Sequence, residues 1–304
     1  MFQSSNNINY IGKPFVKWVG GKRQLLSVIE ETLPKEILTK KAITYVEPFV
    51  GGGAMLFWML NNFSTIKKAI INDINSDLTN AYIIVRDRVN DLISLLKDIE
   101  TTYLSIEKEE KRKEFYLLQR ERYNTKSLDE LENAALFIFL NRTCFNGLYR
   151  VNSSGLFNVP FGKYSKVTIC DKETLLSDSF LLQKVEILTG DFNQTIKYAK
   201  KDSFFYIDPP YKPLSKTSSF NSYSKETFDD VEQIRLKHFC DNLNDRNSLW
   251  ILSNSDPKSN DDNNNFFDDL YSAYQIKRIL AFRQVNSNAQ KRGKLNELLI
   301  SNSI

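Results

Sequence analysis

The sequence of 304 residues contains one histidine and three cysteines. Because His238 stands alone, mechanisms that need a histidine pair or a histidine metal cluster are excluded. Cys144, Cys170 and Cys240 are odd in number and widely spaced, and no C-x-x-C pair occurs. This pattern argues against a zinc site and against a disulfide framework, so we expect a protein without bound metal in a reducing cytoplasm.

Long apolar runs are also absent. No stretch reaches the about 18 consecutive apolar residues of a membrane span, and the first ten residues are rich in Asn and Ser. We therefore expect neither membrane association nor a secretion signal. Hydrophobic residues make up 41% and charged residues 26% of the chain, which is typical of a folded globular protein.

Charge alone does not decide the function. Lys and Arg number 41 and Asp and Glu 37, an excess of four that permits a polyanionic partner but also suits many enzymes. The length predicts two domains.

A strand, a glycine-rich turn and a helix are predicted near the start of the chain. The apolar run 43–46 leads into Glu47-Pro48-Phe49-Val50-Gly51-Gly52-Gly53, and residues 54–60 have helical potential. A second short strand at 69–71 ends at Asp73, 22 residues after Gly51. Such a turn lets a ligand approach the backbone, and the acid can accept both ribose hydroxyls. The pattern also fits a simple tight turn, and it does not distinguish a dinucleotide from S-adenosylmethionine.

The most informative motif is Asp208-Pro209-Pro210-Tyr211, directly after the apolar strand 204–207. An aryl amine is a poor nucleophile because its lone pair is delocalised, and the Asp208 carboxylate and Pro209 carbonyl are acceptors for its N–H groups. The prolines remove two backbone donors and restrict the loop. Tyr211 offers an aromatic face on which a flipped base can stack. A strand that merely ends in a capping Asp and prolines is the structural alternative.

The order of elements predicts a mostly parallel α/β sheet with an insertion. Residues 78–140 are helical in pattern, and residues 147–164 form a loop or hairpin with interleaved aromatic and basic residues. Strand-like runs then return at 185–188, 203–207, 249–252 and 298–300. We predict a first part of a catalytic domain at 1–75, an inserted domain at 76–168 and the second part at 169–304.

A third block, Lys17-Trp18-Val19-Gly20-Gly21-Lys22, completes a set that resembles the Dam-type family of DNA adenine-N6 methyltransferases, of the α-class motif order. Further signatures are 46–53, 72–75, 141–152, 157–162 and 208–211. The resemblance implies a Rossmann-like class I methyltransferase sheet that uses S-adenosylmethionine, with an inserted, mainly helical target-recognition domain. It also implies double-stranded DNA as the partner and methylation of adenine N6.

The resemblance assigns roles residue by residue. The catalytic residues are Asp208, Pro209, Pro210 and Tyr211. The cofactor contacts are Trp18, Lys22, Glu47, Pro48, Gly51, Gly53, Asp73, Asp191, Phe192 and Asp208. The DNA contacts are Lys17, Arg142, Phe145, Asn146, Leu148, Arg150, Asn152, Asn158, Pro160 and Lys163. Among them Arg150 matches a guanine reader, and an Arg fork to guanine O6 and N7 is a frequent major-groove contact.

The recognition sequence implied by the resemblance is GATC, with another site that begins GAT as the alternative. Leu156 and Phe145 depart from residues that are frequent in the family, namely Glu and Tyr. An RNA-base or protein-amide methyltransferase can share the D-P-P-Y loop, and a non-catalytic DNA-binding regulator is a further alternative. The intact motifs and the basic, aromatic insertion favour a DNA methyltransferase, which we expect to be a monomer.

Overall fold

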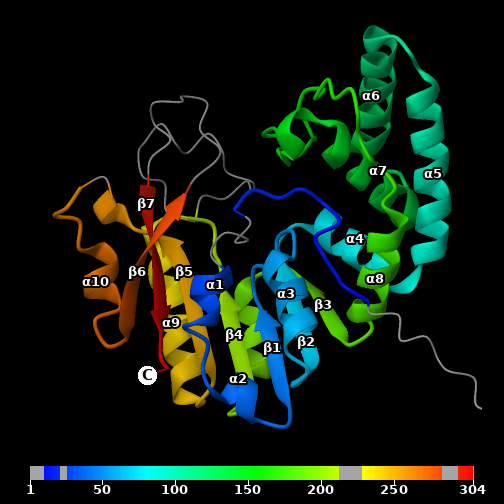
Figure 1. The fold of residues 1–304 in the computed structure, drawn as a ribbon. Helices are drawn as coiled ribbons and strands as arrows, with labels where there is room; N and C mark the ends of the chain where they lie inside the picture. Colours follow the sequence, from blue (N-terminus) through cyan, green and yellow to red (C-terminus); the bar gives the residue numbers. More distant parts are fainter. Residues whose placement is uncertain (1–9, 21–25, 212–227, 260, 283–293, 304) are drawn as a thin grey trace, which may run out of the picture.

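The computed structural model describes residues 10–20, 26–211, 228–259, 261–282 and 294–303. Within these residues the chain forms a sheet of seven strands in the order β3-β2-β1-β4-β5-β7-β6 (Figure 1). The strands are β1 (Ile43–Glu47), β2 (Ile66–Asp73), β3 (Val185–Thr189), β4 (Ser203–Ile207), β5 (Leu249–Ser255), β6 (Gln275–Phe282) and β7 (Lys294–Ser301). The strands β1 to β5 pair in parallel, and β7 is antiparallel to β5 and β6.

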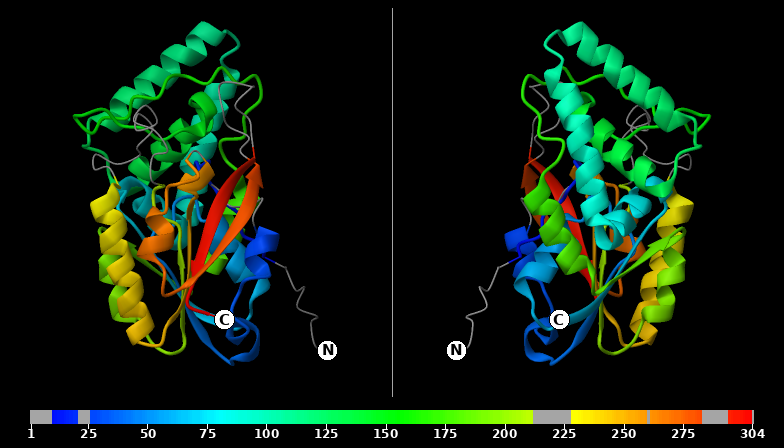
Figure 2. Two further views of the ribbon diagram at one scale, coloured as in Figure 1. Left: turned by 90° about the vertical axis from the view of Figure 1, so that its left-hand side faces the viewer. Right: turned by 90° about the vertical axis from the view of Figure 1, so that its right-hand side faces the viewer.

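Helices cover both faces of the sheet because successive side chains of each strand point to opposite faces. Tyr45, Phe204 and Tyr206 pack into one apolar cluster, and Val46 and Phe205 into the other. Figure 2 shows the helices on the two sides. The first cluster includes residues of α1 (Leu26–Glu30), α2 (Glu36–Thr39), α3 (Ala54–Asn62), α4 (Ser76–Asp87) and α8 (Lys172–Leu182). The second includes residues of α9 (Asp230–Asp245) and α10 (Phe266–Leu270).

The predicted α/β class and Rossmann-like sheet are confirmed, although β5 and β7 extend beyond the predicted runs 249–252 and 298–300. The strand β2 is longer than the predicted 69–71, and β6 was not predicted. The segment of β6 carries Lys277 and Arg278, which interrupt its apolar pattern. Because β6 lies at the edge of the sheet, these exposed side chains do not prevent its pairing with β7.

Three further helices extend from the β3 side of the sheet (Figure 1): α5 (Val89–Ser105), α6 (Glu109–Asn124) and α7 (Glu130–Thr143). The helix α7 is at the centre of this group, since residues 134–141 are all buried. The charged α6 buries only Tyr116 and Tyr123. A loop and a short hairpin follow α7 and lead to α8. The helical character predicted for 78–140 is confirmed, whereas the domain boundaries at 75 and 168 stay a prediction. No described helix is long and apolar enough to cross a membrane.

A single carboxylate connects α4 to this helical group. Asp77 Oδ2 accepts hydrogen bonds from the hydroxyls of Tyr123 at 2.6 Å and Tyr149 at 3.2 Å. Its carboxylate also pairs with Lys126 at 3.2 Å and accepts from Asn133 at 3.3 Å. Because Tyr123 and Tyr149 are buried, their hydroxyls have little access to water as a substitute partner.

We therefore expect Asp77→Ala to lower the free energy of unfolding by about 3 kcal/mol, since each buried hydroxyl left without an acceptor costs about 1–3 kcal/mol. The measurement is urea denaturation followed by tryptophan fluorescence. The matched control is Asp91→Ala, which removes an exposed ion pair with Arg88 and should change stability by less than about 0.5 kcal/mol. Equal effects of the two substitutions would contradict this role of Asp77.

Candidate functional site

The carboxyl ends of three neighbouring strands bring the predicted acids to one edge of the sheet. Glu47 is the last residue of β1, Asp73 is the last residue of β2, and Asp208 follows β4 directly. The strands β2, β1 and β4 are adjacent and parallel, so the three residues share this edge. Ligands of open α/β sheets bind at the carboxyl edge.

Asp73 holds the glycine-rich turn that follows β1. Its Oδ2 accepts a hydrogen bond from Gly51 N at 3.0 Å, and its Oδ1 accepts from Asn75 N at 3.0 Å. Burial raises the pKa of Asp73, and these backbone N–H groups act in the opposite direction. Next to it, the amide of Asn72 donates to Pro48 O at 2.9 Å, so β2 is tied to the turn at two points.

The turn lies between two aromatic side chains and has no room for a Cβ atom. Gly51 has φ 49°, and a Cβ there would lie 2.8 Å from Trp18 Cδ1. Gly53 has φ 75°, and its Cβ would lie 2.4 Å from the hydroxyl oxygen of Tyr82, which donates to Gly51 O at 3.0 Å. A nucleoside-containing ligand needs a turn whose backbone it can approach closely and an acid next to that turn. The predicted cofactor contacts Trp18, Gly51, Gly53 and Asp73 therefore lie together, and Lys22 lies outside the described residues.

Glu47 is almost completely buried, with 2% of its surface exposed. Burial raises its pKa well above the usual range, a hydrogen bond of 2.9 Å from the Tyr45 hydroxyl acts in the opposite direction, and the charges of Asp208 and Asp73 raise it further. Because the charges of Asp208 and Asp73 act on Glu47, these two carboxylates concentrate a negative field at this edge. Such a field favours a cationic ligand.

The Asp208 to Tyr211 motif turns towards β5 and β7. Pro209 is buried, and Tyr211 is half-buried. The hydroxyl of Tyr211 donates to Glu297 Oε2 at 3.0 Å and lies 3.3 Å from Ser253 Oγ. Ser253 and Glu297 were not predicted from the sequence. Glu297 is 7% exposed. The one sequence feature that could have indicated it is its position directly before the apolar run 298–300.

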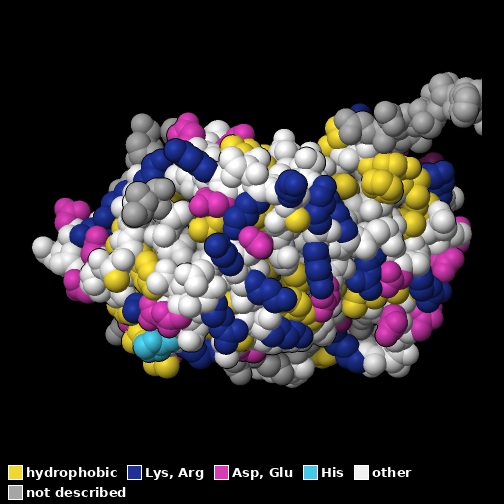
Figure 3. Space-filling model, turned by 90° about the horizontal axis from the view of Figure 1, so that it is seen from below, with side chains coloured by type: hydrophobic (Ala, Val, Ile, Leu, Met, Phe, Trp, Pro, Cys, Tyr) yellow, Lys and Arg dark blue, Asp and Glu magenta, His cyan; other side chains and the backbone are white. Residues whose placement is uncertain are grey.

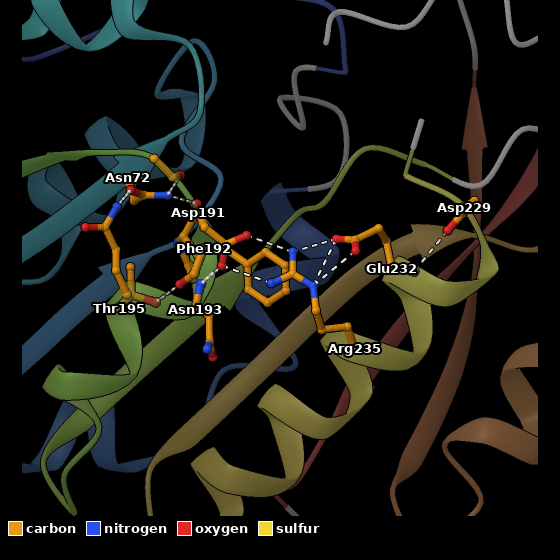
Figure 4. Close-up of polar contacts among 11 residues, drawn as sticks. Asn72, Asp191, Phe192, Asn193, Thr195, Asp229, Glu232 and Arg235 are labelled. Atoms are coloured by element: carbon orange, nitrogen blue, oxygen red, sulfur yellow. Dashed lines mark hydrogen bonds and ion pairs between the residues drawn. The ribbon is translucent and has the colours of Figure 1, made fainter. Parts of the chain in front are cut away.

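The predicted cofactor contacts Asp191 and Phe192 lie against α9 (Figure 4). Asp191 forms two hydrogen bonds with Arg235, at 3.0 and 2.7 Å, and the guanidinium carbon lies 4.2 Å from the centre of the Phe192 ring. Arg235 is the main cause that lowers the pKa of Asp191. Asp191 Oδ1 also accepts from Asn193 N at 2.9 Å and thus caps η2 (Phe192–Tyr198). The Arg235 contact was not predicted from the sequence.

The N-terminal segment brings Lys17 to the loop after α7. The side chain of Asn141 accepts from Lys17 N at 2.8 Å and donates to Lys17 O at 2.8 Å and to Gly147 O at 3.0 Å. The ammonium group of Lys17 lies 4.6 Å from the centre of the Tyr164 ring. One buried amide therefore fixes residues that are 124 positions apart in the sequence.

Several predicted DNA contacts lie on this loop. Phe145 is 50% exposed, and its N–H donates to Pro160 O at 2.8 Å. Asn146 has φ 55° and donates its N–H to the Tyr164 hydroxyl at 2.8 Å. The exposed Arg150 donates to Asn158 Oδ1 at 2.7 Å across the hairpin. Phe145, Asn146 and Arg150 are thus exposed on the same loop, and Leu148 is partly buried.

Three other predicted DNA contacts have intramolecular partners. Arg142 is partly buried, donates to Phe15 O at 2.7 Å, and has its pKa lowered by burial. Asn152 Oδ1 accepts from Ser154 N and Leu156 N, both at 3.0 Å, and so turns the hairpin. Lys163 pairs with Glu109 at 3.4 Å. These contacts favour structural roles for Arg142 and Asn152, and DNA contact by all three stays a prediction.

The sheet, with a glycine-rich turn after β1, an acid ending β2 and a D-P-P-Y motif after β4, defines the class of Rossmann-like methyltransferases. Residues 18–285 match the family model described as D12 class N6 adenine-specific DNA methyltransferase, and the chain belongs to this family. The enzyme class predicted from the sequence is therefore confirmed.

Curated relatives match over nearly their whole length. The Type II methyltransferase M.MjaIII of Methanocaldococcus jannaschii is 48% identical over 95% of this chain and 99% of that protein. The Type II methyltransferase M1.LlaDCHI of Lactococcus lactis is 38% identical over 98% and 97%. The DNA adenine methylase of Escherichia coli is 33% identical over 94% of each chain.

We expect Gly53→Ala to destabilise the enzyme more than Gly20→Ala. Both glycines have a positive φ, but a Cβ at Gly53 meets Tyr82 at 2.4 Å whereas a Cβ at Gly20 has no atom of the described residues within 4 Å. Backbone strain alone costs roughly 1 kcal/mol or more, and the clash at position 53 should about double that loss of unfolding free energy. Urea denaturation of both variants measures the difference, and equal losses would show that the Tyr82 contact does not constrain the turn.

Proposed function

We propose that the enzyme transfers a methyl group from S-adenosylmethionine to N6 of the adenine in double-stranded GATC. The observation that supports this most directly is the position of the Asp208 to Tyr211 motif beside the glycine-rich turn, at the edge shared by Glu47 and Asp73. A methyl donor and an amine acceptor can meet there.

The chain's residues fit the proposed cofactor. The Asp73 carboxylate can accept hydrogen bonds from ribose hydroxyls in addition to those that it accepts from Gly51 N–H and Asn75 N–H. The acids Glu47, Asp73 and Asp208 suit a positively charged sulfonium, and Trp18 borders the turn. When bound, S-adenosylmethionine would supply an electrophilic methyl group. The roles of Lys22, Asp191 and Phe192 are part of this proposal.

Asp208 and Pro209 act on the target amine. The Asp208 carboxylate and the Pro209 carbonyl accept hydrogen bonds from the two N–H groups of adenine N6, which makes the nitrogen lone pair available for methylation. Because the two prolines restrict the loop, these acceptors are positioned before the base arrives. Transfer is direct, without a covalent enzyme intermediate, and the flipped adenine stacks on Tyr211.

The proposed target sequence rests on the loop after α7. Arg150 is exposed and suits guanine in the major groove, Lys17 lies beside the same loop, and Phe145 protrudes as an aromatic wedge. Relatives named DNA adenine methylase are consistent with a solitary enzyme, whereas those named Type II methyltransferase are consistent with restriction–modification. We propose a monomer that treats each strand in turn.

Glu297 and Ser253 are proposed to position Tyr211. The hydrogen bond to the buried Glu297 fixes the hydroxyl end of the ring, and Ser253 lies beside it. The ring plane that receives the flipped base is thereby held by β5 and β7, two strands that do not carry the D-P-P-Y motif. Glu297 acts through Tyr211 and is a positioning residue.

Labelled S-adenosylmethionine and a set of duplexes test the reaction. We expect label on GATC duplexes, none when the target adenine is blocked at N6, and a loss of at least about 100-fold with Asp208→Ala because a preorganised polar acceptor is removed. Asp202→Ala is the matched control. Asp202 is exposed and lies directly before the amino end of β4, whereas Asp208 follows its carboxyl end. Transfer to GATA, GATG or GATT in preference to GATC would overturn the proposed site, and transfer only to RNA would overturn the proposed substrate.

A double-mutant cycle tests the positioning of Tyr211. Glu297→Leu and Tyr211→Phe should each lower kcat/KM by about tenfold, because a hydrogen bond to a charged group is worth roughly 1.5–3 kcal/mol. If Glu297 acts through the hydroxyl, the double variant should be no worse than either single one. Glu297→Gln keeps an acceptor and should recover part of the activity. Fluorescence of 2-aminopurine at the target position reports base flipping; additive losses with unchanged fluorescence would contradict this role.

A further inference from the structure

The edge of the sheet opposite the catalytic site is strongly basic. Viewed from below, Lys and Arg side chains gather over the middle of the molecule (Figure 3). The amino ends of β3, β2, β1, β4 and β5 lie next to one another at this edge. Exposed or partly exposed basic residues stand at or just before each of these ends. We call the following six residues the basic face: Lys41, Lys67, Lys184, Lys200, Lys201 and Arg246.

The pairing of the strands places these residues side by side. Val185 is opposite Ala69, so Lys184 is next to the start of β2. Ser203 is opposite Thr44, so Lys200 and Lys201 approach the start of β1. Two neighbouring lysines are neutralised: Lys40 pairs with Asp202 at 2.8 Å and Lys68 with Glu186 at 2.7 Å.

The six residues of the basic face have no ion pair with any described acid. Burial lowers the pKa of Lys184, and the charge of Lys67 lowers it further, which shows that two like charges are held close together. Like charges gathered in this way repel one another unless an anion neutralises them.

The dimensions and chemistry of the basic face suit the backbone of a DNA duplex. Five strands spaced by about 4.8 Å span about 19 Å, and duplex DNA carries a charge every 1.7 Å or so. The length of duplex that covers the width of the basic face thus carries roughly ten phosphates, of which those on the near side face the lysines. Lysine is depleted at the cores of protein–protein interfaces, whereas Lys and Arg make most contacts to phosphates.

We propose that the basic face binds the backbone of a second DNA segment, without regard to its sequence, while the catalytic edge holds the segment to be methylated. The parallel strands, of five to eight residues each, separate the two surfaces by roughly 17–26 Å, so two duplexes do not collide. A long DNA molecule supplies the second segment at high local concentration. One enzyme molecule would then bridge two segments and pass between them without release into solution.

The test uses the full chain, a biotinylated duplex with one GATC site and a fluorescent duplex without the site. The readout is capture of the fluorescent duplex on streptavidin beads, with mass photometry to show one protein molecule with two duplexes. Lys67→Gln/Lys200→Gln should reduce capture at least about tenfold and lower the salt slope of second-duplex binding by about two, one for each phosphate that the variant no longer neutralises. Lys97→Gln/Lys172→Gln, which removes two exposed lysines outside the basic face, is the matched control and should leave capture unchanged.

Failure of the wild-type protein to capture the second duplex would overturn the proposal, as would equal capture by the Lys67→Gln/Lys200→Gln variant. Capture of an acidic polypeptide such as polyglutamate in place of duplex DNA would also overturn it and assign the basic face to a protein partner. Methylation of the short single-site duplex should be equal for both variants. Because capture is read without turnover, a bridged complex without methyl transfer would contradict the proposed reaction and leave this inference standing.

Discussion

The hydrogen bond between Gly51 N–H and the Asp73 carboxylate joins the ends of two strands, and the rest of the site depends on it. Parallel strands leave their polar ends together at one edge, where backbone groups have no partner within the sheet. Asp73 satisfies the turn after β1, and Trp18 and Tyr82 close on the glycines from both sides. The pairing of β1 with β4 brings Glu47 and Asp208 to the same edge, and the acids concentrate negative potential at the place where a cationic cofactor is proposed to bind.

The helical insertion is coupled to this turn by a few polar and aromatic contacts. Asn141 clamps the backbone at Lys17, and the Trp18 ring stacks on Tyr149 with 5.7 Å between centroids. Tyr149 in turn donates to Asp77 at the start of α4. The residues proposed to read DNA are therefore connected to the proposed cofactor turn through adjacent side chains. This continuity is a physical route by which DNA binding can affect the geometry of the turn.

The molecule has opposite electrostatic characters at the two edges of its sheet. Acids collect at the carboxyl edge, where they follow the apolar strands, and lysines collect at the amino edge, where they precede the strands. The strands between them are buried and apolar, so neither set neutralises the other. The two edges are thus suited to different ligands: a cation with its target base at one, and a polyanion at the other.

Several elements could be predicted from short-range patterns in the sequence. Apolar runs gave the strands β1, β3, β4 and β5, the glycines after β1 indicated a tight turn, and Asp208 to Tyr211 could be recognised because the four residues are contiguous. The strand β6 was not predicted, because Lys277 and Arg278 interrupt its apolar pattern. Distance along the chain explains Glu297, Ser253 and Arg235, which meet Tyr211 or Asp191 only when the sheet and α9 are assembled. The burial of Arg142 against Phe15 was likewise decided by tertiary packing, since a residue type does not reveal which neighbour will accept its hydrogen bonds.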